Sequence, residues 1–196
     1  MGVGSSMSSR VTKCLVLIRL IVVLIAAVAN AGCDHRASEA IPKSPVPSDA
    51  HAISVRVANI DEYRATLAKL RGKVVLVDFW ATWCPSCVEQ FPHTVELNRK
   101  YVERGLAVVS VSLDEPDAEP QVREFLHRNG ASFDNLLSAY GGGVKAIEAF
   151  GLSGAVPCYR VYDRMGELRH EFAVDPRAPR QFTTADIEAA VVELLE

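Results

Sequence analysis

The chain has 196 residues, of which 49% are hydrophobic and 23% are charged, and its formal net charge is −3. This length and this apolar content predict one domain with a sizeable core, together with an additional segment. The small negative net charge gives no support for a nucleic-acid-binding protein, because such proteins carry a basic patch or stripe.

The N-terminus has the features of an export signal. Basic residues precede an apolar run at residues 20–29, which is short for a membrane span and has the length of a signal-peptide hydrophobic region. Ala31 and Gly32, two small residues directly before Cys33, resemble a bacterial lipoprotein cleavage site. Residues 1–33 are therefore predicted to be a signal or lipoprotein signal, with Cys33 as the lipidated residue. Ordinary cleavage nearby and an uncleaved membrane anchor are the alternatives, and all three hypotheses place the rest of the chain outside the cytoplasm.

Residues 34–51 contain three prolines among small and charged residues and show no apolar period. This composition predicts a disordered linker that holds the following domain away from a membrane.

Residues 52–196 form the predicted folded domain, in which strand and helix patterns alternate. In chain order, the patterns predict a strand at 53–57, a helix at 59–72, a strand at 74–80, a helix after residue 84, a strand at 106–113, a helix at 119–129, an extended piece at 133–137, a glycine loop at 141–143, a helix at 144–150, a hairpin with arms at 158–162 and 167–173, and a helix at 183–196. Crossovers followed by a hairpin and a helix predict an α/β fold, with a mixed sheet covered by helices on both faces.

A pair of cysteines at C-x-x-C spacing, Cys84 and Cys87, begins the helix that follows the buried strand at 74–80. Two thiols at this spacing can close a small disulfide ring. The first thiol also faces unpaired backbone N–H groups and the positive end of the helix dipole, which stabilise the reactive thiolate. The arrangement therefore predicts thiol–disulfide exchange.

A structural zinc site is the alternative use of the pair. Zinc usually takes four Cys or His ligands, and the sequence contains no second C-x-x-C motif. His93 lies further along the same helix and is predicted to be a solvated helical residue. We therefore expect redox chemistry and no bound metal.

At this point the chain resembles the TlpA/ResA-like thiol–disulfide oxidoreductases of bacterial envelopes, which have a thioredoxin fold. The resemblance covers about residues 59–196. It rests on the motif at 75–87, on Pro92 as a helix-kinking proline, on Pro157 just before a strand, and on the hairpin turn at 163–166. It implies a thioredoxin-like three-layer α/β/α sandwich with a mixed central sheet.

The family implies a role for each active-site residue. Cys84 would attack the substrate disulfide, and Cys87 would resolve the mixed disulfide. Asp78 matches the buried acid of thioredoxins, where desolvation would raise its pKa and let it take the proton of Cys87. The alternative for Asp78 is a strand residue satisfied by a local hydrogen bond.

The family also implies a substrate-binding surface around the dithiol. Pro157, in cis, would leave the backbone groups of Val156 free to pair with an extended substrate segment, whereas a trans proline would merely open an edge strand. Trp83 and Pro85 would contact the substrate beside the dithiol, and Trp80 would pack beneath it.

Two positions depart from the family pattern. Many relatives carry Glu where this chain has Gln90, while Glu89 faces elsewhere on the helix. The residue after the cis-proline is commonly Thr, and here it is Cys158, which the fold is expected to bring close to Cys84. Cys158 could be a packing residue, a possible third redox thiol or a soft-metal ligand, and the packing role is our prediction.

The leading hypothesis is an enzyme without cofactor: an envelope-tethered thiol–disulfide oxidoreductase on the periplasmic side of the cytoplasmic membrane. Its predicted partners are a disulfide-containing protein substrate and a membrane or envelope thiol reductant. One alternative is a thiol peroxidase of the peroxiredoxin branch, but its T-x-x-C pattern would place Thr82 one residue earlier. The other is a copper chaperone that uses Cys84, Cys87 and Cys158, although the C-x-x-x-C motif and His of copper-delivering relatives are not evident.

Overall fold

The computed structural model describes residues 53–196. The predicted signal at 1–33, its lipidation site Cys33 and the predicted linker at 34–51 lie outside the described residues. Among residues 53–196, no helix is long and apolar enough to cross a membrane.

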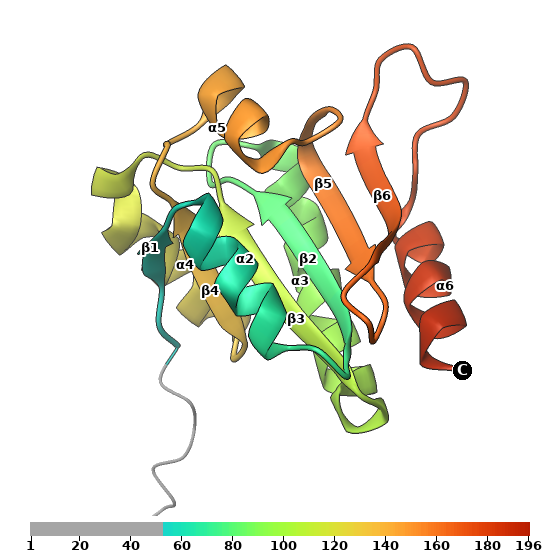
Figure 1. Ribbon diagram of the computed structural model, residues 1–196. Coiled ribbons are helices and arrows are strands. Elements are labelled where there is room, and N and C mark those ends of the chain that lie inside the picture. Colours follow the sequence, from blue (N-terminus) through green and yellow to red (C-terminus); the bar gives the residue numbers. More distant parts are fainter. Residues whose placement is uncertain (1–52) are drawn as a thin grey trace, which may run out of the picture. The chain divides into compact units, whose positions relative to one another are not determined.

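The described residues form a six-stranded sheet and five α-helices (Figure 1). The elements are β1 (Arg56–Ala58), α2 (Ile60–Lys69), β2 (Val74–Trp80), α3 (Pro85–Tyr101), β3 (Leu106–Ser112), α4 (Glu119–Asn129), β4 (Asp134–Ser138), α5 (Gly143–Phe150), β5 (Ala155–Tyr162), β6 (Leu168–Val174) and α6 (Thr184–Leu195).

The sheet has the strand order β1-β4-β3-β2-β5-β6. β1, β4, β3 and β2 run parallel, whereas β5 pairs antiparallel with both β2 and β6. The sheet is therefore mixed, with the predicted hairpin at one edge.

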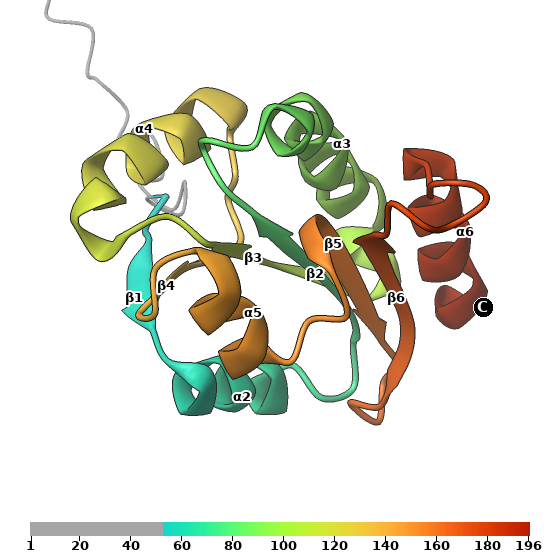
Figure 2. The same cartoon turned by 90° about the horizontal axis from the view of Figure 1, so that it is seen from above.

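Helices cover both faces of the sheet, with α3, α4 and α6 on one side and α2 and α5 on the other (Figure 2). All seven residues of β2 are buried, because the strand lies in the middle of the sheet between the two helical layers. The three-layer α/β/α sandwich with a mixed central sheet, predicted from the sequence, is confirmed.

Local signals set several helix ends where they were predicted. The side chain of Asn59 accepts hydrogen bonds from the backbone of Asp61 (2.9 Å) and Glu62 (3.0 Å), and the Glu62 carboxylate accepts one from Asn59 N (2.8 Å), which completes a capping box at the predicted helix start. Helix α4 spans the predicted residues and ends at Gly130, whose φ of 68° lies in the left-handed region that glycine adopts readily.

Other elements differ from the prediction. The first strand is limited to residues 56–58, because only these pair with β4. Helix α2 ends at Lys69 rather than at Gly72, and β5 begins at Ala155, three residues before the predicted arm. In the first turn of α3, Val88 is 37% exposed, because the buried residues of this part of the helix are those on the same face as Cys87.

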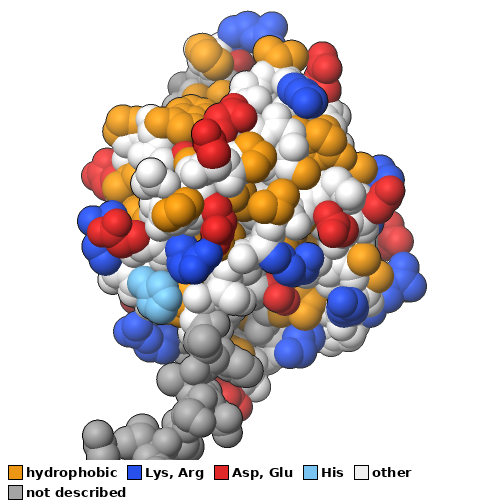
Figure 3. All heavy atoms as spheres, turned by 90° about the vertical axis from the view of Figure 1, so that its left-hand side faces the viewer, with side chains coloured by type: hydrophobic (Ala, Val, Ile, Leu, Met, Phe, Trp, Pro, Cys, Tyr) orange, Lys and Arg blue, Asp and Glu red, His pale blue; other side chains and the backbone are white. Residues whose placement is uncertain are grey.

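The surface is mixed in charge. On the face shown in Figure 3, basic and acidic side chains alternate with hydrophobic ones. This pattern suits a small net charge rather than a single-sign field.

Candidate active site

The two cysteines lie at the start of α3, directly after the carboxyl end of β2. Cys84 is the N-cap residue of α3 and Pro85 occupies the first helical turn. The Cys84 sulfur accepts a hydrogen bond from the backbone N–H of Cys87 at 3.2 Å, and the two residues form a disulfide with a Cα–Cα distance of 5.2 Å. The structure therefore brings together the two predicted redox residues, and the backbone N–H aimed at Cys84 is of the kind that would stabilise its thiolate.

The first residues of β5 lie against the dithiol. The Val156–Pro157 peptide bond is cis, as the resemblance implies. Cys84 Sγ lies 3.8 Å from the carbonyl oxygen of Val156. A backbone segment at the start of β5 is thus adjacent to the sulfur that would react.

The disulfide has buried residues on one side and solvent-exposed residues on the other. Trp80 is fully buried and belongs to the same hydrophobic cluster as Cys84 and Cys87. Trp83 is 58% exposed, and Pro85 is also exposed. Both flank Cys84 in the chain, so this side of the disulfide is open to solvent.

Asp78 is buried in the layer between β2 and α3. Its Oδ2 accepts a hydrogen bond from the Thr94 hydroxyl at 2.6 Å, while Oδ1 has no hydrogen-bond partner among the described residues. Thr94 and Cys87 both lie on the inner face of α3, two turns apart. Burial raises the pKa of Asp78 from 3.8 to about 7, and the bond from Thr94 opposes this rise.

Asp114, just beyond the end of β3, was not singled out by the sequence. Its carboxylate is buried and accepts three hydrogen bonds, from Thr82 N (3.0 Å), from the Thr82 hydroxyl (2.5 Å) and from the Ser112 hydroxyl (2.6 Å). Thr82 belongs to the loop that carries Cys84. The sequence did offer a signal for Asp114, because it is an acid that directly follows a predicted parallel strand. The carboxyl ends of such strands meet at one edge of the sheet, where Cys84 also lies.

Cys158, which was expected close to Cys84, lies on the opposite face of the sheet from Cys84 and Cys87. It is paired with Phe79 in the β2–β5 ladder and packs in the cluster beneath α2 and α5, whereas Cys84 and Cys87 pack with α3 and α4. It is a free thiol with no exposed surface. Burial, with a smaller contribution from the charge of Glu171, raises the pKa of Cys158 to about 12.

Two polar residues of α3 each have a buried polar atom. His93, predicted to be solvated, is only partly exposed, and its Nε2 is shielded from solvent. The Oε1 atom of Gln90 is shielded in the same way, and neither atom has a hydrogen-bond partner among the described residues. Over residues 53–196, no three His, Cys, Asp or Glu side chains gather in a group that could hold a metal ion.

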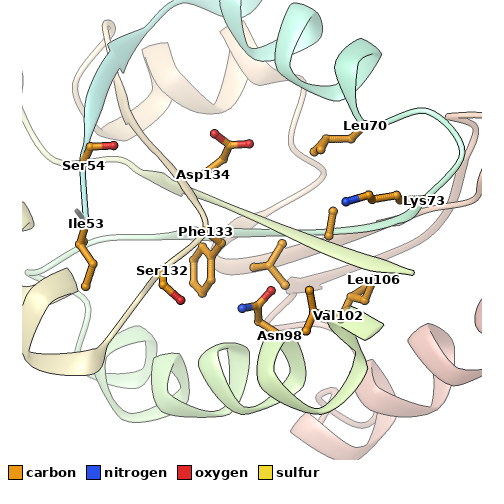
Figure 4. Close-up of a pocket in the computed structure, with 12 residues that line it drawn as sticks. Ile53, Ser54, Leu70, Lys73, Asn98, Val102, Leu106, Ser132, Phe133 and Asp134 are labelled. Carbon is orange, nitrogen blue, oxygen red and sulfur yellow. The ribbon is translucent and has the colours of Figure 1, made fainter. Parts of the chain in front are cut away.

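The pocket in Figure 4 lies away from the dithiol. It has a volume of about 370 Å³ and is lined by residues at the amino-terminal ends of the parallel strands, including Lys73, Leu106 and Asp134. Cys84 follows the opposite, carboxyl end of β2. The dithiol therefore lies at the opposite edge of the sheet from this pocket, with Cys84 only 5% exposed and Cys87 buried.

Comparisons with known proteins agree with this geometry. The Redoxin family model matches residues 44–191. The thiol-disulfide oxidoreductase ResA of Halalkalibacterium halodurans is 30% identical over 117 residues, which cover 60% of this chain and 63% of that protein. ResA of Geobacillus thermodenitrificans is 29% identical over 134 residues, covering 65% and 76% of the two chains. The chain thus spans less than two thirds of the Halalkalibacterium relative.

A solved structure shows the same architecture. A protein of Chlorobium tepidum described as a thiol:disulfide interchange protein DsbE superposes with a TM-score of 0.54 at 27% identity, covering 66% of this chain and 85% of that structure. The fold is therefore thioredoxin-like. The chain belongs to the Redoxin family, and its similarity to ResA and DsbE proteins confirms the predicted resemblance to the TlpA/ResA-like thiol–disulfide oxidoreductases.

Proposed function

We propose that this protein is a thiol–disulfide oxidoreductase that reduces disulfides of partner proteins. The observation that carries the proposal is the Cys84–Cys87 disulfide at the N-terminus of α3, with the Val156 carbonyl beside the Cys84 sulfur. The named activity of the ResA relatives supports the same chemistry.

The reaction begins with the reduced dithiol. The Cys84 thiolate attacks one sulfur of the partner disulfide, whose S–S bond breaks, and the other partner sulfur leaves as a thiolate that takes up a proton. Cys87 then attacks Cys84 Sγ, the mixed disulfide breaks, and the partner leaves fully reduced. Two electrons have passed to the partner, and the protein is left with the Cys84–Cys87 disulfide, which an envelope thiol reductant must reduce again.

Asp78 is proposed to accept the proton that Cys87 loses in the second step. A carboxyl group with a pKa of about 7 is matched to proton transfer near neutral pH. Trp83, Pro85 and the Val156 backbone are proposed to hold the substrate segment, because they surround Cys84 at the open side of the site.

The peroxidase alternative gains no support from the site. The Thr82 hydroxyl donates its hydrogen bond to Asp114, so its proton is engaged away from the dithiol. A copper site made of the three cysteines gains none either, because Cys158 packs on the other face of the sheet.

Trapping tests the mechanism. Cys87→Ser, reduced and mixed with a protein disulfide such as insulin, should accumulate a disulfide-linked complex through Cys84. Cys84→Ser should form none, and Cys158→Ser should behave as the wild type. A complex that forms equally well without Cys84 would contradict the proposed order of attack.

We propose further that the domain works outside the cytoplasm, tethered through the lipidated Cys33. The export-like composition of residues 1–33 supports this location. Cys33→Ala should lose acyl modification and leave the membrane fraction. Membrane retention of that variant would show an uncleaved anchor instead.

A further inference from the structure

Asp114 makes several hydrogen bonds to the loop that carries Cys84, more than a packing role requires. The backbone ladder between β2 and β3 runs one step past the strands, with Leu113 N donating to Trp80 O at 2.7 Å. This places Asp114 opposite Thr82, and both the backbone N–H and the hydroxyl of Thr82 donate to its carboxylate. The hydroxyl of Ser112 donates to the same carboxylate, and the Asp114 backbone N–H donates back to that hydroxyl at 3.1 Å.

The segment between Thr82, which is hydrogen-bonded to Asp114, and the Cys84 sulfur is very short. Only Trp83 separates Thr82 from Cys84, and Cys84 N donates to Ala81 O at 3.2 Å. The turn is therefore held at Thr82 by the carboxylate and at Cys84 by the backbone. A charge-assisted pair of donors to one carboxylate is stronger than neutral hydrogen bonds and fixes direction as well as distance.

The loop after β4 supports the same turn from the other side. A side chain at Gly142 would meet Leu113 O at 2.7 Å and the Trp83 ring at 3.4 Å, so the backbone approaches both closely. Gly142 N also donates to the Glu115 carboxylate at 3.3 Å. Three loops, which follow three neighbouring parallel strands, thus meet around the turn that carries the dithiol.

We propose that Asp114 is a positioning residue for the dithiol, which orients Cys84 toward a partner disulfide by clamping Thr82. This inference rests on the proposed oxidoreductase function. The carboxylate acts through Thr82 and does not touch the reacting sulfurs in the structure, so its effect belongs to the encounter with a protein substrate. Displacement of a reacting group by about 1 Å can cost up to roughly a hundredfold in rate.

Two single variants separate positioning from charge. Thr82→Val removes the hydroxyl donor and keeps the Asp114 charge, whereas Asp114→Asn removes the charge and keeps the shape. Positioning predicts that both slow mixed-disulfide formation with a protein substrate by roughly tenfold or more. It also predicts that the double variant is no slower than the worse single one, since both changes break one interaction. Thr82→Ser, which restores the donor, should return the wild-type rate.

Alkylation of reduced Cys84 by iodoacetamide separates positioning from a general disturbance of the site, because such a disturbance would also change the reactivity of the Cys84 thiolate. The small reagent needs no oriented encounter, so Thr82→Val should keep the wild-type alkylation rate and pH profile while it reduces insulin slowly. Asp117→Asn, the same change at an exposed position three residues on, is the matched control and should behave as the wild type.

The outcomes are distinct. If Thr82→Val reduces insulin at the wild-type rate, the clamp does not position the dithiol. If Asp114→Asn only shifts the pH profile of alkylation, its role is electrostatic and the proposal is overturned. If Asp114→Asn does not fold, the comparison of Thr82→Val with Thr82→Ser still decides. If the wild type reduces no protein disulfide, the proposed function itself is wrong, and the wild-type assay alone shows this.

Discussion

Replacing Asp78 by Asn should make the protein more stable above neutral pH, although it alters a residue proposed to act in catalysis. The folded protein holds the Asp78 proton more tightly than the unfolded chain, because burial raises the pKa from 3.8 to about 7. Between these two values the folded state binds more protons, so the free energy of unfolding falls as pH rises from about 4 to about 7 and levels off above that. Asn, which does not ionise, should remove this fall.

The magnitude follows from the same two values. A difference of about 3 pH units, at about 1.4 kcal/mol each, corresponds to roughly 4 kcal/mol of lost stability when the carboxylate is fully ionised. Burial of the neutral amide costs part of this gain, because Asn brings donors that also need partners. Its carbonyl oxygen can still accept the bond from Thr94, which limits that cost.

Urea denaturation of the oxidised protein at pH 5 and at pH 8 measures the effect. Asp78→Asn should exceed the wild type by a few kcal/mol at pH 8 and by much less at pH 5. Asp117→Asn, at an exposed position, controls for the loss of one carboxylate. An equal change at both pH values, or a loss of stability at pH 8, would refute the assignment of Asp78 as an uncompensated buried acid. The same variant should slow release of the mixed disulfide more than its formation.

Three further predictions concern other parts of the domain. Alkylation of the reduced protein near neutral pH should label Cys84 well before Cys87, as peptide mapping would show, and equal labelling would count against the helix-terminus argument. Arg160→Ala should lower the free energy of unfolding by about 3–5 kcal/mol, because it leaves the partly buried Glu171 without its ion partner and removes the donors to the carbonyls that end α5. Arg169→Ala, whose side chain is 54% exposed, should change it by less than about 1 kcal/mol in the same denaturation assay. Cys158→Thr should leave insulin reduction nearly intact, whereas a dominant Cys84–Cys158 link in the oxidised wild type would overturn the packing role.

Features that depend on nearby residues were predictable from the sequence. The dithiol, its helix and the capping box of α2 each depend on residues within a few positions of one another, so their spacing alone specifies them. Helix α4 was predicted to the residue for the same reason, because its apolar period ends at Gly130.

Features that depend on strand register were not predictable in this way. Asp114 and Thr82 are 32 residues apart and meet only because β2 and β3 pair in one register. The orientation of Cys158 follows from its pairing with Phe79, since neighbours in a ladder face the same side of a sheet. Because Cys158 follows Pro157 in the chain, we expected it to lie close to Cys84. The alternation of side chains along β5 instead points its thiol to the other face of the sheet.

The two buried aspartates near the dithiol show how the number of donors determines what a carboxylate can do. Asp114 accepts three hydrogen bonds, so its charge is compensated and its removal should destabilise the loop that it holds. Asp78 accepts one and keeps an oxygen without a partner among the described residues, so its charge is costly and its proton is exchangeable near neutral pH. Aspartate-to-asparagine substitution is therefore expected to have opposite signs at the two sites at pH 8. A compensated carboxylate is suited to hold a backbone in place, and an uncompensated one is suited to take a proton from Cys87.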